Sequence, residues 1–229
     1  MQPSHHMPAY PYPGSTRPRT PEDLYLTPPP WDIGRPQPAL RALADAGALH
    51  GRVLDVGCGT GEHALMAARV GLDATGVDLA TNALRVARQK ARARGLTARF
   101  VHHDARRLAE LGESFDTVLD CGLFHIFADA DRAAFVDSLR AVVPPGGRYF
   151  MLGFSDRQPG DWGPHRLTRE EIAAAFAHGW RVDSIEPATI EVSTEPDEIR
   201  AWLVAVTRVS GTANSGSAGS DAAGQGIPC

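Results

Sequence analysis

The chain has 229 residues, of which 43% are hydrophobic and 22% are charged, and its formal net charge is −4 at pH 7. This length suits one α/β domain with a substantial core and leaves little room for a second. The composition is that of a soluble globular protein, no apolar run reaches the roughly 18 residues that span a bilayer, and the acidic balance argues against nucleic acid as a partner.

We predict that residues 1–24 form a disordered, proline-rich segment. Residues 1–38 hold eleven of the eighteen prolines, and proline fixes φ and lacks an amide proton, which excludes a regular helix or a central strand. The first residues have neither the basic start nor the apolar centre of a secretory signal, so we expect a cytoplasmic protein. The three widely spaced cysteines, Cys58, Cys121 and Cys229, indicate neither a disulfide framework nor a metal site.

Short apolar runs then alternate with helical patterns. We predict buried parallel strands at residues 52–56, 74–77, 98–101, 115–120 and 148–152. Residues 82–94 carry leucine and alanine on one face and arginine on another, as in an amphipathic helix on a sheet. Thr168 and Glu171 form a capping box that begins another helix.

Two longer apolar runs, 182–192 and 199–209, are expected to close the sheet as antiparallel strands. The predicted fold is therefore α/β, a doubly wound and mostly parallel seven-stranded sheet with an antiparallel last strand and helices on both faces. Residues 25–209 form this domain, with 25–50 as an arm and helix over the ligand site. Residues 210–229, rich in Gly, Ser and Ala, are expected to be a disordered tail.

The strongest local signal is a strand that leads directly into a glycine-dense turn, Val53-Leu54-Asp55-Val56-Gly57-Cys58-Gly59-Thr60-Gly61. Glycine lacks the Cβ atom that would hold a ligand away from the backbone, and it permits positive φ. About twenty residues later the next strand ends in Asp78-Leu79, where a carboxylate can accept hydrogen bonds from both hydroxyls of a ribose. The pattern predicts a nucleoside-containing ligand at the carboxyl end of the first strand.

Two kinds of ligand fit this turn. Residues 59–64 satisfy the loose dinucleotide fingerprint, so an NAD-dependent oxidoreductase or a non-catalytic nucleotide-binding module is one alternative. A dinucleotide brings an anionic pyrophosphate, whereas S-adenosylmethionine brings a sulfonium, an ammonium and one carboxylate. Asp55, just before the glycines, would repel phosphate and attract the cationic amino-acid moiety. Charge therefore favours S-adenosylmethionine.

The spacing resembles that of the class I S-adenosylmethionine-dependent methyltransferases, whose first motif D-x-G-x-G-x-G is met by Asp55, Gly57, Gly59 and Gly61. The resemblance covers residues 25–209 and implies a Rossmann-like fold and a small-molecule acceptor. We expect a monomer or a weak dimer that binds no nucleic acid. The resemblance also implies cofactor contacts from four places in the chain. These are Cys58 in the turn, Asp78 and Leu79 after the second strand, Asp104 and Ala105 in the segment that holds adenine, and Asp120 at the end of the fourth strand.

Residues 30–38, Pro-Trp-Asp-Ile-Gly-Arg-Pro-Gln-Pro, resemble the P-W-D-x-G segment of thiopurine-like, thiol, halide and tellurite methyltransferases, which lies over the cofactor. Trp31 is expected to pack on the methionine end of the donor, where a ring face near a sulfonium gains a cation–π attraction. The alternative for Trp31 is a plain hydrophobic plug. Asp32 either contacts the substrate or pins the turn.

The pattern as a whole resembles actinobacterial methyltransferases of hydroxylated quinones and nitrogen heterocycles. This resemblance implies an aromatic acceptor that is methylated on oxygen or nitrogen, as in the detoxification of a xenobiotic. A thiol, halide or tellurite acceptor is the alternative.

Methyl transfer is an in-line displacement, so the protein mainly aligns the acceptor and excludes water. His125, after the fourth strand, is the first candidate for a general base because a pKa near 7 suits proton removal. A hydrogen bond between His125 and the backbone is the alternative. His165 is the second candidate base. Further expected substrate contacts come from the arm, the fourth-strand loop and an aromatic lid: Tyr25, Phe124, Phe154 and Trp162.

Overall fold

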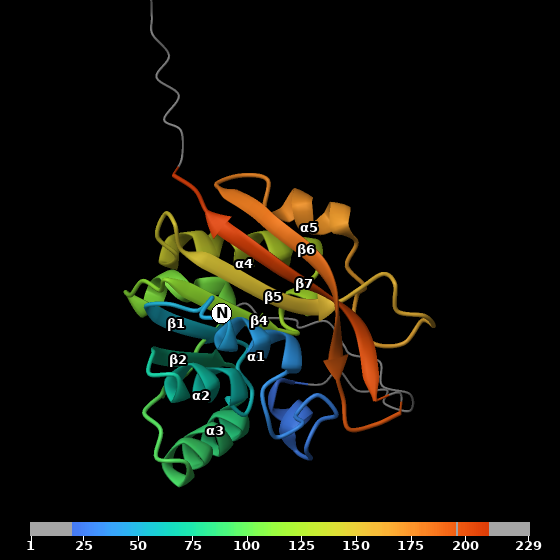
Figure 1. Cartoon of the computed structure of the whole chain (residues 1–229). Helices are drawn as coiled ribbons and strands as arrows, with labels where there is room; N and C mark the ends of the chain where they lie inside the picture. Colours follow the sequence, from blue (N-terminus) through green and yellow to red (C-terminus); the bar gives the residue numbers. More distant parts are fainter. Residues whose placement is uncertain (1–19, 196, 211–229) are drawn as a thin grey trace, which may run out of the picture.

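A seven-stranded sheet forms the centre of the protein (Figure 1). Its strands lie in the order β3-β2-β1-β4-β5-β7-β6. The first five strands are parallel, and β7 is antiparallel to both of its neighbours, as predicted. The strands are β1 (Arg52–Val56), β2 (Asp73–Asp78), β3 (Arg99–His102), β4 (Thr117–Cys121), β5 (Arg148–Phe154), β6 (Trp180–Glu191) and β7 (Glu198–Arg208).

Helices cover both faces of this sheet, because alternate residues of each strand point to opposite sides. On β1, Leu54 and Val56 join an apolar cluster with η2 (Ala105–Leu111), α4 (Asp129–Val142) and α5 (Arg169–Ala175). Val53 points the other way, into a cluster with α1 (Pro38–Asp45) and α2 (Glu62–Arg69). The predicted helix at 82–94 is α3 (Thr81–Ala93), and the capping box of α5 is present. A membrane-spanning helix would need more length and apolar character than any helix in residues 20–195 and 197–210 has.

The computed structural model describes residues 20–195 and 197–210. The disorder predicted for residues 1–19 and 211–229 lies outside the described residues. The sequence assigned residues 20–24 to the same disordered segment. The structure corrects that expectation, because residues 22–24 belong to the 3₁₀ helix η1 (Glu22–Tyr25). The carboxylate of Glu22 accepts hydrogen bonds from the N–H groups of Thr81 (2.5 Å) and Asn82 (3.2 Å). These two groups lie at the start of α3, where backbone N–H groups have no partner within the helix.

The β6–β7 hairpin extends beyond the carboxyl end of β5. Phe154, the last residue of β5, pairs with Ala201 of β7. The pair formed by Ile190 and Ile199 lies further along the hairpin, past the end of β5. The hairpin therefore overhangs the edge of the sheet at which the parallel strands end (Figure 1).

Candidate active site

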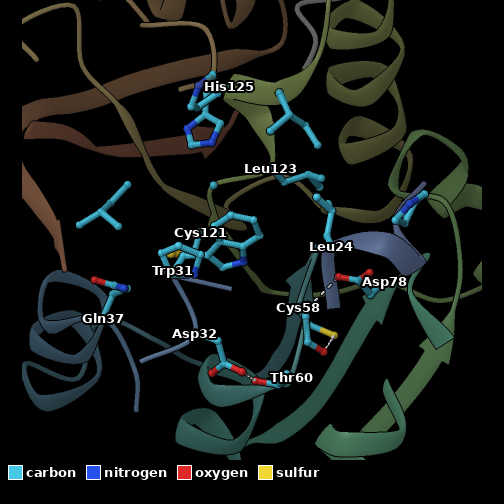
Figure 2. A pocket seen from close by; sticks show the side chains of 18 of the residues that line it. Leu24, Trp31, Asp32, Gln37, Cys58, Thr60, Asp78, Cys121, Leu123 and His125 are labelled. Atoms are coloured by element: carbon cyan, nitrogen blue, oxygen red, sulfur yellow. Dashed lines mark hydrogen bonds between the residues drawn. The ribbon is translucent and has the colours of Figure 1, made fainter. Parts of the chain in front are cut away.

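A cavity of about 530 Å³ lies at the carboxyl ends of β1, β2 and β4, within the size range of small-molecule sites. Figure 2 shows Cys58, Thr60 and Asp78 at one end of it and His125 at the other. The cavity brings together these predicted site residues: Tyr25, Trp31, Asp32, Gly57, Cys58, Gly59, Asp78, Leu79, Asp104, Ala105, His125, Phe154 and Trp162.

The glycine turn forms the floor of the polar end, and its glycines have different roles. Gly57 and Gly59 have φ of 65° and 51°. A Cβ on Gly59 would lie 2.5 Å from the Tyr25 hydroxyl, and one on Gly57 would lie 3.1 Å from Leu123, so side chains here would fill the cavity. Gly61 does not line the cavity. A Cβ there would lie 2.7 Å from the ring of Phe100, which makes Gly61 a packing glycine and corrects its predicted role as a ligand contact.

Asp78 connects the end of β2 to the glycine turn. Its Oδ2 accepts a hydrogen bond from Gly59 N–H and its Oδ1 accepts one from Ala80 N–H, both at 2.8 Å. Burial raises the pKa of this carboxyl group. Each carboxylate oxygen can accept a second hydrogen bond, so Asp78 holds the turn in place and still presents acceptors to a ligand hydroxyl.

Asp104 lies at the edge of the cavity beside Arg106. Its Oδ1 accepts a hydrogen bond from Arg106 N–H at 2.9 Å, and the guanidinium bridges the carboxylates of Asp104 (2.7 Å) and Asp131 (2.6 Å). This ion-pair network fixes the orientation of Asp104. Ala105 follows it on the cavity wall, and a role for this segment in holding an adenine remains a prediction.

Asp55 and Asp120 do not line the cavity, which corrects the direct contacts predicted for them. Asp55 is 1% exposed, and its Oδ2 accepts a hydrogen bond from Ala64 N–H of α2 at 3.0 Å. Asp120 is fully buried and accepts hydrogen bonds from the N–H groups of Leu123 and Phe124 and from the Tyr149 hydroxyl. Burial raises the pKa of Asp55 to about 8 and that of Asp120 to about 7. Both carboxyl groups support the turns that carry the site.

Asp32 attaches the arm to the glycine turn, and because it also lines the cavity, its contact with a substrate remains a prediction. Its Oδ2 accepts a hydrogen bond from the Thr60 hydroxyl at 2.9 Å (Figure 2). The ammonium of Lys90, from α3, donates to the same hydroxyl at 2.7 Å and pairs with Glu62 at 2.8 Å. Lys90 Nζ is also 3.6 Å from Asp32 Oδ1. This network, which we call the arm clamp, joins Asp32, Thr60, Glu62 and Lys90.

Gln37, which was not predicted as a site residue, attaches the arm to the β6–β7 hairpin. Its side-chain amide donates to the carbonyl of Glu191 at 2.9 Å and accepts from the N–H of Glu191 at 2.8 Å, so it pairs with β6 much as a strand does. Its own N–H donates to His63 Nε2 at 3.1 Å. A glutamine in a proline-rich segment gives no sequence signal for this role.

Trp31 and Tyr25 bring aromatic groups from the arm to the cavity. Trp31 is 36% exposed at the cavity surface. Burial and the charge of Asp78 raise the pKa of Tyr25, and a hydrogen bond with Trp31 offsets part of this increase. Contact between Trp31 and a sulfonium remains a prediction.

The far end of the cavity is mostly apolar and includes His125. The ring of His125 lies edge-on to Phe154 with centroids 5.0 Å apart, and Phe154 lies edge-on to Trp162 at 6.1 Å. The sequence did not identify the remaining apolar lining, although the unusual length of the last two strands was a signal for part of it. These residues are Leu123, Ile126, Ile190, Val192 and Ile199.

One predicted substrate contact, Phe124, and the second candidate base, His165, lie away from this end. Phe124 is fully buried and stacks on Phe176 with centroids 5.8 Å apart, because its side chain points from η3 (Phe124–Ile126) into the core. His165 is exposed, pairs through Nε2 with Glu171 of α5 at 2.8 Å and does not line the cavity. Neither residue is placed for the role that was predicted. In the described part of the chain, no group of three or more His, Cys, Asp or Glu side chains is arranged to hold a metal ion.

Residues 53–147 match the family described as a methyltransferase domain. The chain is 36% identical over 179 residues to the 2-heptyl-1-hydroxyquinolin-4(1H)-one methyltransferase of Mycobacteroides abscessus, which covers 77% of this chain and 78% of that protein. It is 40% identical over 161 residues to the demethylmenaquinone methyltransferase of Thermus thermophilus, and this match covers 67% of this chain and 72% of that protein. A solved structure titled for the conversion of a disulfide bond into a thioacetal group during echinomycin biosynthesis is similar with a TM-score of 0.73 and 38% identity, over 80% of this chain and 86% of that one.

Proposed function

Because the chain belongs to the class I S-adenosylmethionine-dependent methyltransferases, we propose that it methylates a small hydroxylated aromatic or heterocyclic acceptor on oxygen or nitrogen. One observation carries the proposal. A single cavity joins a polar end, built by the glycine turn and Asp78, to an apolar end around Phe154 and Ile190. Two relatives are named for a hydroxyquinolinone and a demethylmenaquinone, which agrees with an acceptor of this kind.

The polar end fits S-adenosylmethionine. Asp78 can accept hydrogen bonds from ribose hydroxyls, and Asp104 and Ala105 line the cavity edge where we expect the adenine. Gly57 and Gly59 leave bare backbone where a side chain would fill the space. When bound here, the cofactor supplies a methyl carbon that is activated by the adjacent sulfonium.

The apolar end would align the acceptor and exclude water. Leu123 and Phe154 offer flat or branched apolar surfaces on which an aromatic ring can pack, and the hairpin residues Ile190 and Ile199 extend this surface. Holding two reactants in line accounts for about 7–11 kcal/mol of barrier reduction in favourable cases. This chain therefore contributes mainly through placement.

A sulfur acceptor is the second candidate. It is favoured by the 38% identity to the protein whose structure is titled for the conversion of a disulfide bond into a thioacetal. It is also consistent with the Pro30-Trp31-Asp32 segment, which lines the same cavity.

The test combines binding with product analysis. Calorimetric titration with S-adenosylmethionine, S-adenosylhomocysteine and NAD is expected to give micromolar binding for the first two and none for NAD. Hydroxyquinolines, quinols and thiols are then incubated with the protein and S-adenosylmethionine, and mass spectrometry locates the added methyl group. Methylation of thiols alone would select the second candidate. Binding of NAD alone would refute both and support an oxidoreductase.

A further inference from the structure

One ring nitrogen of His125 is committed to the backbone. Nδ1 lies 3.0 Å from the N–H of Phe154 in a buried hydrogen bond. A backbone N–H can only donate, so Nδ1 must carry the accepting lone pair. In the neutral imidazole the single proton is then on Nε2. The fold of β5 thus fixes the tautomer of His125.

The other nitrogen, Nε2, faces the cavity. His125 lines the cavity, although it is only 5% exposed. Its Nε2 atom does not belong to the fully enclosed side-chain nitrogens that lack a hydrogen-bond partner, so it is open to the cavity. No side chain or carbonyl in the described part of the chain accepts a hydrogen bond from it. A Cβ on Gly122 would lie 3.5 Å from Nε2, so glycine at this position leaves space beside that atom.

The surroundings keep the ring neutral. Phe154 packs edge-on against it, and nearby His165 and Arg132 of α4 oppose a positive charge on the ring. Burial is the larger cause, and together these effects lower the pKa of His125 to about 3. The imidazolium that a general base must become is therefore disfavoured.

We propose that His125 is a fixed hydrogen-bond donor to the acceptor molecule and not its base. Nε2–H points at an acceptor oxygen, so the site selects hydroxylated aromatic compounds that are acidic enough to ionise in water before they bind. This inference rests on the proposed function and narrows its substrate class. It replaces the general-base role predicted for His125, and the backbone hydrogen bond that was the predicted alternative is present.

The reaction then needs no proton transfer to the protein. The acceptor loses its proton to water, and an oxygen lone pair of the resulting anion forms the bond to the methyl carbon. The carbon–sulfur bond breaks as this bond forms, and its electron pair stays on sulfur. The products are a neutral methyl ether and the neutral thioether S-adenosylhomocysteine.

Two variants separate the two nitrogens. His125→Gln places an amide N–H where Nε2–H was, but loses the acceptor for Phe154. His125→Asn places an amide oxygen where Nδ1 was, but loses the donor to the cavity. We expect His125→Gln to keep most of kcat/KM and His125→Asn to lose about 10- to 100-fold, since a hydrogen bond to a charged group is lost. Both variants should bind S-adenosylhomocysteine as the wild type does.

The pH dependence gives an independent test. With phenols and hydroxyquinolines of graded acidity, kcat/KM should rise with pH and level off at the pKa of each acceptor. A protein base would instead give one common pKa for all acceptors, and its disappearance in His125→Gln would overturn the inference. Long-range ¹H–¹⁵N spectra should show the Nε2–H tautomer of His125 without protonation down to about pH 5, a reading that needs no turnover.

The outcomes distinguish this inference from the proposed function. If the wild type methylates none of the oxygen or nitrogen acceptors, the proposed function fails. If it methylates them but His125→Asn is as active as His125→Gln, or the spectra show the Nδ1–H tautomer, only the inference about His125 fails.

Discussion

Replacing Gly61 by alanine should destabilise the fold more than replacing Gly71, although both glycines have nearly the same backbone conformation, with φ of 86° and 87°. Positive φ costs an alanine about 1–2 kcal/mol at either position. A Cβ at Gly61 would also lie 2.7 Å from Phe100 and 2.8 Å from Ala87, whereas one at Gly71 meets no atom within 4 Å. Overpacking adds about 1–3 kcal/mol. We therefore expect losses of about 2–5 kcal/mol for Gly61→Ala and about 1–2 kcal/mol for Gly71→Ala.

Gly59→Ala is expected to lower ligand affinity, whereas Gly61→Ala is expected to lower stability. Its Cβ would meet the hydroxyl end of the Tyr25 side chain, which can move, so the stability loss should match that of Gly71→Ala. The same Cβ occupies cavity space, so affinity for S-adenosylhomocysteine should fall. Urea denaturation followed by circular dichroism measures stability, and calorimetry measures affinity. Equal stability losses for Gly61→Ala and Gly71→Ala would refute the packing argument, and unchanged affinity in Gly59→Ala would refute the role of that glycine in the site.

Three further predictions concern the arm. Gln37→Ala leaves the partly buried N–H and C=O of Glu191 without this partner and should lower the free energy of unfolding by about 1–3 kcal/mol, whereas Gln37→Glu should cost at least as much in the same denaturation assay, because a carboxylate oxygen would face the Glu191 carbonyl oxygen at a position that is 2% exposed. Thr60→Val removes the hydroxyl at the centre of the arm clamp and should weaken S-adenosylhomocysteine binding about 2- to 10-fold by calorimetry; unchanged affinity would mean that the clamp does not hold the arm closed. Burial lowers the pKa of His63 to about 4, so between about pH 6.5 and 4 the unfolded state binds a proton that the folded state does not, and stability falls as pH falls through this window. The difference between wild-type and His63→Gln stability curves should show this slope, and parallel curves would contradict it.

The sequence located the site because its main signal is local. The turn at Gly57 and Gly59 needs backbone conformations that only glycine adopts readily, so residue identity alone reveals it. The mostly parallel sheet with its antiparallel last strand followed from the alternation of apolar runs and helical patterns, whereas the order of the strands was not predicted. The sequence did not predict which way the side chains of Asp55 and Asp120 point. The pleat of the strand and the neighbouring turn decide whether a carboxylate at a strand end faces a ligand or the interior.

The rest of the site depends on contacts between distant parts of the chain. Gln37 meets Glu191 across 154 positions, and no pattern within either segment reveals that pairing. The apolar end of the cavity depends on the register of β7 on β5, which carries Ile199 past the last residue of β5. The role of His125 depends on which ring nitrogen meets the backbone, and the sequence left a general base and a backbone hydrogen bond as alternatives.

The arm clamp also has a practical consequence, because Lys90 is the only lysine in the chain. Its side chain is 20% exposed, and its ammonium is engaged by Glu62 and by the Thr60 hydroxyl under the arm. An ammonium in such contacts must be released before it can lose its proton and react with an acylating reagent. The rate of acylation at this single ε-amine therefore reports how often Lys90 leaves the arm clamp, and the protein carries its own chemical probe of that network without any engineered label.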